Sequence, residues 1–219
     1  MKTSSSAAFP LMIICFFTLA FNSRQLSATA AATTTDETEF ISATCIKASA
    51  PYQSLCKSSL SPFASTVKKD LGILARLAID VNRNQTDLVL STVTTLISSF
   101  TAGGSKNLTI KGALENCSTH LESSVVKMRS SIETMQQLNG SRSATPPPAG
   151  GHKALTLEDV KGWMNAALDE EKLCDRAFDQ VGDMSLKGNV LGKLLLAKQF
   201  TSNAVALISF NLLQRLGLN

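Results

Sequence analysis

Residues 107–138 read NLTIKGALENCSTHLESSVVKMRSSIETMQQL, and this stretch carries the clearest periodicity in the chain. Its apolar residues recur at steps of three and four positions: Leu114, Cys117, Leu121, Val125, Met128, Ile132 and Met135. Positions three and four apart share one face of an α-helix, so the pattern predicts a long helix with one buried side. Asn139-Gly140 follows and predicts the end of that helix.

Residues 63–100 show a similar pattern, which predicts a long helix that ends before Gly103-Gly104. The expected buried positions form two groups separated by a one-residue shift. They are Val67, Leu71, Leu74, Ala78, Val81 and Leu88, followed by Val89, Val93, Leu96 and Phe100.

Two further helices are predicted over residues 156–181 and 189–216. Thr156 and Asp159 resemble a capping box, with Asp in place of the usual Glu. The residues expected to face inward are Val160, Met164, Ala167, Leu168, Cys174 and Phe178 in the first helix and Thr201, Val205, Ile208 and Leu212 in the second. Residues 141–153, with three prolines and a glycine pair, predict an exposed loop between helices.

Four long helices joined by short links predict an all-α fold, an up-down-up-down four-helix bundle over residues 61–219. Ahead of it, residues 36–60 predict a small helical hairpin. Cys45 and Cys56 flank Ala50-Pro51-Tyr52, and proline disfavours helix at the residue before it, so the turn is expected there. A bridge between these two cysteines would pin the two short helices together.

Residues 1–30 have the layout of a secretory signal peptide: Lys2, an apolar run over residues 9–21, and small residues around Ala30. Cleavage is expected near Ala30, with a site after Ser23 as the alternative. The run is shorter than the roughly 20 apolar residues that span a membrane, although an uncleaved anchor is the competing interpretation. No later membrane anchor is expected, because Asn211, Gln214 and Arg215 interrupt the apolar C-terminal stretch.

Cleavage would leave four of the five cysteines: Cys45, Cys56, Cys117 and Cys174. An even number in a secreted chain predicts two disulfides, for which three pairings are open. Cys117 is early in one predicted helix and Cys174 late in the next, so in antiparallel neighbours they would lie at the same end. No C-x-x-C pair or paired histidines indicate a metal site, and none is expected.

The sequence offers little for catalysis or for nucleic-acid binding. Cleavage removes Lys2 and Arg24, which lowers the formal net charge from +4 to +2, and no Lys/Arg block marks a phosphate-binding patch. The two histidines, His120 and His152, stand outside any catalytic motif. Residues 169–171, Asp-Glu-Glu, are interpreted as a solvated face. We therefore expect no enzyme activity and no cofactor.

The surface supplies the remaining candidate sites. Asn84, Asn107 and Asn139 begin glycosylation sequons, and a fourth sequon at Asn116 has Cys117 in its middle position. Outward positions on a disulfide-locked pair of helices would be well preorganised for docking. The predicted partner-binding residues are Thr119, Glu122, Ser123, Arg129, Lys161, Asn165 and Asp169.

Four segments, in order, carry a family pattern: residues 41–56 with their Cys…Ala-Pro-Tyr…Leu-Cys spacing, 113–117 (ALENC), 159–174 (DVKGWMNAAL followed by Cys174) and 196–206 (LAKQFTSNAVA). Together they resemble the plant invertase and pectin methylesterase inhibitor family. The resemblance covers nearly the whole chain after the signal peptide. It implies a four-helix bundle with an N-terminal hairpin, and cysteines paired first with second and third with fourth.

The resemblance also implies a function: a secreted protein of the apoplast or cell wall that binds a pectin methylesterase one-to-one and covers its substrate cleft. Asp159-Val160-x-x-Trp163 favours this branch, and the Pro-Lys-Phe motif frequent in invertase inhibitors is absent. An invertase inhibitor is the alternative. The chain departs from the family pattern at Asn116, Thr119 and Leu121, where the family usually has Asp, Glu and Tyr.

Two other interpretations stay open at this stage. A secreted helical module could carry a lipid, which requires an enclosed cavity, or serve only as a folded scaffold. The chain could also correspond to the inhibitor-like domain that some pectin methylesterases carry, in which case it would act in trans.

Overall fold

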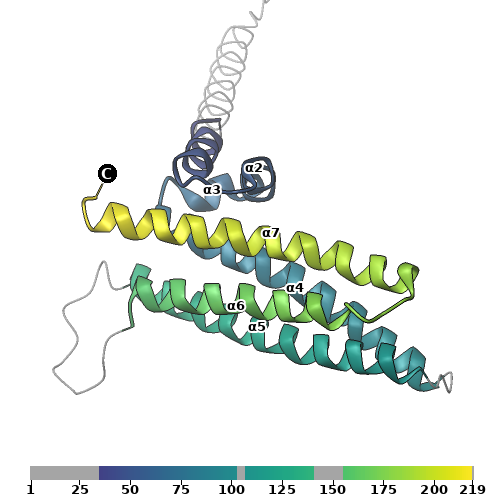
Figure 1. Ribbon diagram of the computed structural model, residues 1–219. Coiled ribbons are helices and arrows are strands. Elements are labelled where there is room, and N and C mark those ends of the chain that lie inside the picture. The colour runs from purple at the N-terminus through teal and green to yellow at the C-terminus, as the bar shows by residue number, and fades with distance from the viewer. Residues whose placement is uncertain (1–34, 103–106, 141–154, 219) are drawn as a thin grey trace, which may run out of the picture.

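The computed structural model describes residues 35–102, 107–140 and 155–218. The predicted signal peptide and the whole predicted loop over residues 141–153, which includes His152, lie outside these ranges. Four long helices dominate the described chain: α4 (Leu71–Ala102), α5 (Leu108–Gly140), α6 (Leu157–Ala177) and α7 (Met184–Arg215). Successive helices pack side by side, and α7 returns to pack on α4 (Figure 1). The predicted all-α, up-down-up-down bundle is confirmed.

Capping explains where α6 and α7 begin. The predicted capping box is present, because Thr156 Oγ1 accepts from the Asp159 N–H at 3.3 Å and Asp159 Oδ2 accepts from the Thr156 N–H at 2.8 Å. The fourth helix begins at Met184, five residues before the predicted start. Asp183 caps it by accepting from the backbone N–H groups of Ser185 and Leu186 at 3.0 and 2.9 Å. The third helix ends at Ala177, short of the predicted residue 181.

The prediction of one continuous helix over residues 63–100 was wrong. A short 3-10 turn (Ser61–Phe63) and α3 (Ala64–Val67) precede α4. The helical conformation is interrupted at residues 68–70, between α3 and α4. Lys68 and Lys69 have positive φ angles of 46° and 61°, a left-handed conformation that a helix cannot continue through. Asp70 then starts α4 by accepting from the Ile73 N–H at 2.9 Å.

The inner face of α4 also differs from the prediction. Leu88, expected in the core, is 61 % exposed, whereas Asn82 and Thr86 are buried. Val89 and Val93 are buried as expected. The inward stripe therefore runs through two polar residues, which the apolar pattern could not include. On α7, Thr201 and Ile208 are buried, and Val205 and Leu212 are only half-buried.

The N-terminal hairpin consists of a helix over residues 35–47 and α2 (Gln53–Leu60), joined by a Cys45–Cys56 disulfide. Its turn is fastened to α7 through Asn203. The Asn203 side chain accepts from the Tyr52 N–H at 3.0 Å and donates to the Tyr52 carbonyl at 2.9 Å. The predicted disulfide-pinned hairpin is confirmed, and it packs on the side of the bundle that α4 and α7 form (Figure 1).

The core consists of two apolar clusters with a polar layer between them. One cluster joins the hairpin to one end of the bundle and includes Leu74, Ile79, Met128 and Met164. The other surrounds the Cys117–Cys174 disulfide. Five buried polar residues from all four long helices lie between the clusters along each helix: Asn82, Thr86, Ser124, Glu171 and Thr201. We call them the polar layer.

Removing each disulfide should destabilise the protein by an amount that rises with the logarithm of the length of the loop that it closes. The Cys117–Cys174 bridge closes 57 residues and the Cys45–Cys56 bridge 11. Loop-closure entropy predicts losses in unfolding free energy of about 4 and about 3 kcal/mol, respectively. Guanidinium unfolding of the two paired Cys→Ala variants checks this order. A larger loss for the hairpin pair would contradict it.

Candidate docking face on α5 and α6

The helices α5 and α6 are held close together at several points along their contact. The Cys117–Cys174 disulfide joins them, with the two Cα atoms 4.0 Å apart. Further along, the Ser124 hydroxyl donates to the Ala167 backbone carbonyl at 3.2 Å. Small side chains at these points allow the two helices to approach closely. Their shared outer side is therefore a stiff surface.

Glu170 connects the two helices at the edge of this surface. Its carboxylate accepts from Lys127 Nζ and Ser123 Oγ, each at 2.9 Å, and lies 2.7 Å from His120 Nδ1. Partial burial raises the pKa of Glu170, but the hydrogen bonds from Lys127, His120 and Ser123 outweigh it and lower the pKa to about 2. An ionised carboxylate only accepts, so His120 carries its proton on Nδ1 when it is neutral.

Ser123, His120 and Glu170 resemble the members of a catalytic triad, but their arrangement differs. A triad requires the serine hydroxyl to donate to the imidazole, which activates it as a nucleophile. Here the Ser123 hydroxyl donates to Glu170 and accepts from Lys127 Nζ at 2.6 Å. The cluster therefore cross-links two helices and lacks the nucleophile–base hydrogen bond. Among the described residues, no three His, Cys, Asp or Glu side chains are grouped to hold a metal ion.

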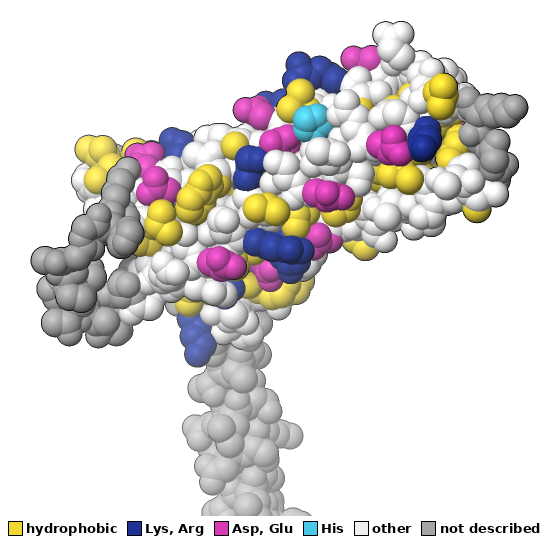
Figure 2. Space-filling model, turned by 90° about the horizontal axis from the view of Figure 1, so that it is seen from below, with side chains coloured by type: hydrophobic (Ala, Val, Ile, Leu, Met, Phe, Trp, Pro, Cys, Tyr) yellow, Lys and Arg dark blue, Asp and Glu magenta, His cyan; other side chains and the backbone are white. Residues whose placement is uncertain are grey.

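Most of the predicted partner-binding residues lie at the surface of α5 and α6. Thr119, Glu122, Arg129, Asn165 and Asp169 are exposed, and Lys161 is half-buried. Ser123 is half-buried as well, and its hydroxyl donates to Glu170 of α6 at 2.9 Å. Figure 2 views the bundle from this side and shows charged side chains scattered over a mostly uncharged polar surface. We call these seven residues, together with the exposed Val126, the docking face.

The interpretation of residues 169–171 as a solvated face holds only for Asp169, which is exposed and pairs with Lys172 at 2.9 Å. Glu171 is fully buried in the polar layer. Thr201 Oγ1 lies 2.9 and 2.8 Å from its two carboxyl oxygens, and Thr86 Oγ1 donates to it at 3.2 Å. Sequence periodicity could have predicted that Glu171 is buried, because it continues the helical spacing of Met164, Ala167 and Cys174.

Burial raises the pKa of Glu171 to about 7. Hydrogen bonds from Thr201 and Thr86 and the positive charge of Lys198 lower the pKa, but the effect of burial is larger. The folded protein therefore keeps a proton between pH 4.5 and 7 that the unfolded chain has lost. Stability falls as the pH rises through this window.

Glu171→Gln should remove this dependence. The wild-type protein should lose up to about 3 kcal/mol of unfolding free energy between pH 4.5 and 8, and the variant much less. Guanidinium unfolding at several pH values measures both slopes. Glu170→Gln is the matched control one residue away. Since the Glu170 pKa is lowered, its stabilisation is present above pH 4.5 and is lost toward pH 2, the opposite direction. Equal slopes for wild type and Glu171→Gln would contradict this account.

The three sequon asparagines differ in their surroundings. Asn84 and Asn107 are exposed, whereas the side-chain nitrogen of Asn139 is buried without a hydrogen-bond partner. Asn139 Oδ1 occupies space that only a glycine leaves open, because a Cβ at Gly72 would lie 2.3 Å from it.

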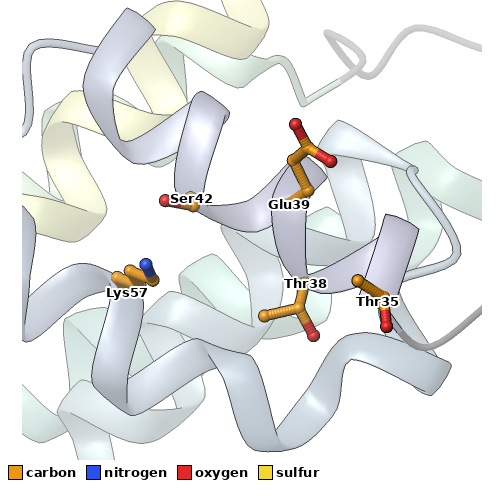
Figure 3. Close-up of a pocket in the computed structure, with 5 residues that line it drawn as sticks. All are labelled: Thr35, Thr38, Glu39, Ser42 and Lys57. Carbon is orange, nitrogen blue, oxygen red and sulfur yellow. The ribbon is translucent and has the colours of Figure 1, made fainter. Parts of the chain in front are cut away.

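The hollows at the hairpin are open surface features. One has a volume of about 430 Å³ and lies between the helix over residues 35–47 and α2 (Figure 3). Its lining side chains are Thr35, Thr38, Glu39, Ser42 and Lys57. A cavity beneath α2, beside Cys56, Ala78 and Asn203, holds about 10 Å³, roughly the volume that one water needs. Neither offers the enclosed apolar space that a lipid carrier requires.

Within the described ranges, no helix combines the length and apolar character needed to cross a membrane.

Comparison with known proteins gives a consistent result. The family model described as plant invertase/pectin methylesterase inhibitor matches residues 39–207. The chain is 26 % identical over 158 residues to pectinesterase inhibitor 10 of Arabidopsis thaliana, which is 72 % of this chain and 47 % of that protein. It is 26 % identical over 181 residues to the 21 kDa protein of Daucus carota, covering 82 % and 87 % of the two chains.

A putative pectinesterase/pectinesterase inhibitor 26 of Arabidopsis thaliana is 23 % identical over 167 residues, 72 % of this chain and 16 % of the longer protein. The chain thus spans about half of the first relative and a small part of this one. No solved structure shows a significant match.

Proposed function

Because the chain belongs to the plant invertase/pectin methylesterase inhibitor family, we propose that it is a secreted inhibitor of a pectin methylesterase. Members of this family are proteinaceous inhibitors and not enzymes, so the prediction that the chain is not an enzyme is confirmed by its membership. The coarser function, inhibition of a pectin methylesterase or an invertase, follows from the same match. The choice of partner and the way in which it is bound are our proposal.

The observation that carries the proposal is the docking face itself. Two helices cross-linked by a disulfide and by the Glu170 cluster lose little conformational entropy on binding. The 21-residue helix α6 is about 30 Å long, and two adjacent helices are about 20 Å wide. That surface is comparable to the roughly 800 Å² that each partner contributes to a stable inhibitor complex. It supports one-to-one binding in which the face covers the substrate cleft.

Two features favour a pectin methylesterase over an invertase as partner. The segment Asp159-Val160-x-x-Trp163 resembles that branch of the family. Two of the relatives carry pectinesterase inhibitor in their names. Invertase inhibition is the second candidate, because the matching family model covers both activities.

The setting of this activity is also proposed. Residues 1–30 would direct secretion to the apoplast or cell wall and be removed, residues 36–60 would form the hairpin unit, and residues 61–219 the inhibitory bundle. Residues of the docking face, and not the hairpin, would contact the enzyme.

Titration of the purified, oxidised protein into a pectin methylesterase and, in parallel, an acid invertase tests the proposal. At mildly acidic pH we expect stoichiometric loss of demethylesterification with sucrose cleavage unchanged. Loss of only the invertase activity would select the second candidate. If both disulfides are intact and several enzymes of each class stay fully active, the inhibitor assignment is refuted.

A charge placed on the docking face should weaken inhibition, whereas the same charge elsewhere should not. Val126 on α5 is 59 % exposed and lies on the same side of the helix as Glu122 and Arg129. Leu88 on α4 is 61 % exposed and provides a matched control, because α4 contributes no residue to the docking face. We expect Val126→Arg to raise the inhibition constant 10- to 100-fold, about 1.4 to 3 kcal/mol, and Leu88→Arg to leave it unchanged.

Thermal melts should show both variants folded, since each site is exposed. Equal inhibition constants for the two variants would place the interface away from α5.

A further inference from the structure

We propose that Asn107 carries an N-linked oligosaccharide that shields the neighbouring Leu108, and that Asn139 does not carry one. The inference rests on the proposed entry of the chain into the secretory pathway. The sequence alone offers several sequons, and the surroundings of each in the fold distinguish them.

The sequon at Asn107 lies wholly at the surface. Asn107, Leu108 and Thr109 are all exposed, at the start of α5. Asn107 Oδ1 accepts from the Ile110 N–H at 3.1 Å and so caps the helix. N-glycosylation takes place on the side-chain nitrogen and leaves the oxygen in place. The cap and the oligosaccharide are therefore compatible.

Leu108 supplies an independent observation. It is 79 % exposed, the most exposed large apolar side chain in the described ranges. Exposing an apolar side chain to water is unfavourable, and burial would stabilise it. An oligosaccharide on Asn107 would cover Leu108 with a bulky, strongly hydrated group, which explains why a leucine is tolerated at this exposed position.

The other sequons fit a glycan less well. The Asn139 nitrogen, which would form the bond, is buried beside Gly72, so an oligosaccharide would block the packing of α5 on α4. At Asn116 the middle residue is Cys117, whose disulfide holds that turn against α6. At Asn84 the threonine, Thr86, is buried in the polar layer and donates to Glu171 at 3.2 Å. The hydrogen bond to Glu171 in the core explains the presence of Thr86 without a role in glycosylation.

The placement is also compatible with the docking face. Asn107 precedes α5 at one end of the bundle, and the hairpin packs nearer the other end (Figure 1). A glycan there extends from the end of the bundle and leaves the outer side of α5 and α6 accessible.

The reaction uses a lipid-diphosphate-linked oligosaccharide as donor. A bond forms between Asn107 Nδ2 and C1 of the first sugar while the bond from C1 to the diphosphate oxygen breaks. The diphosphate leaves with the electron pair of that bond, and the amide nitrogen gives up one proton.

The test is the intact mass of the full chain secreted from plant cells, measured before and after a peptide N-glycosidase, the amidase that releases the whole oligosaccharide and converts the modified asparagine to aspartate. We expect Thr109→Ala to lose the mass of one glycan, because it removes the sequon while keeping the Asn107 cap. Thr109→Ser should retain the glycan. Ser141→Ala, which removes the sequon at Asn139 and leaves that asparagine in place, should not change the glycan mass. Peptide mapping of the treated wild-type protein should find aspartate at position 107.

A secreted wild-type chain that loses no mass to the peptide N-glycosidase would overturn the inference, as would an unchanged glycan mass in Thr109→Ala or aspartate at position 139. A chain that never reaches the medium would overturn the secretory premise. Inhibition assays on protein from any host test the proposed function separately, so the two failures are distinguishable.

Discussion

The bundle depends on keeping the carboxyl group of Glu171 hydrogen-bonded inside its core. The group draws partners from α4 and α7, and Thr201 is in turn bonded to Asn82, whose side-chain nitrogen lies 2.9 Å from the Thr201 hydroxyl. An unpaired carboxyl in this position would cost several kcal/mol, so α4, α6 and α7 must meet in one register. Apolar side chains alone are less selective, because many of them can exchange places at similar packing. We infer that the polar layer specifies the alignment of the helices, and that the apolar clusters on either side supply most of the stability.

The next residue along α6 links the core to the surface. Successive residues on a helix point about 100° apart, so Glu171 enters the core while Glu170 reaches the edge between α5 and α6. The two carboxyl groups experience opposite environments and their pKa values move in opposite directions, to about 7 and about 2. One holds three helices in register, and the other ties α5 to α6 through Lys127, Ser123 and His120. The rigidity of the docking face is therefore set by the same turn of helix that sets the register of the bundle.

The sequence predicted the features that depend on local or repeating signals. The apolar repeat of α5, the Thr156 capping box and the proline turn of the hairpin each involve residues close in the chain, and each is present. The errors arose where tertiary contacts decide the outcome. The break at Lys68 and Lys69 requires left-handed backbone that lysine rarely adopts, and the hairpin packs directly before it. Leu88 was predicted to be buried because it is apolar, and Glu171 to be exposed because it is charged. Their actual burial depends on which side of the helix each residue lies. The residues of the docking face were predicted to lie outward, but their contacts with a partner depend on a second molecule.

The departures from the family pattern can now be separated by position. Leu121 is fully buried in the cluster around the disulfide, so its replacement of the usual tyrosine changes the packing of the core. Asn116 and Thr119 are exposed on α5, where the family usually has Asp and Glu. Two negative charges are thereby missing at and near Thr119, at one end of the docking face. Charge complementarity governs mainly the association rate and the choice of partner, and less the affinity that buried contacts provide. On our proposal that this face contacts the enzyme, the chain should therefore discriminate less strongly in favour of enzymes with a basic rim around the substrate cleft.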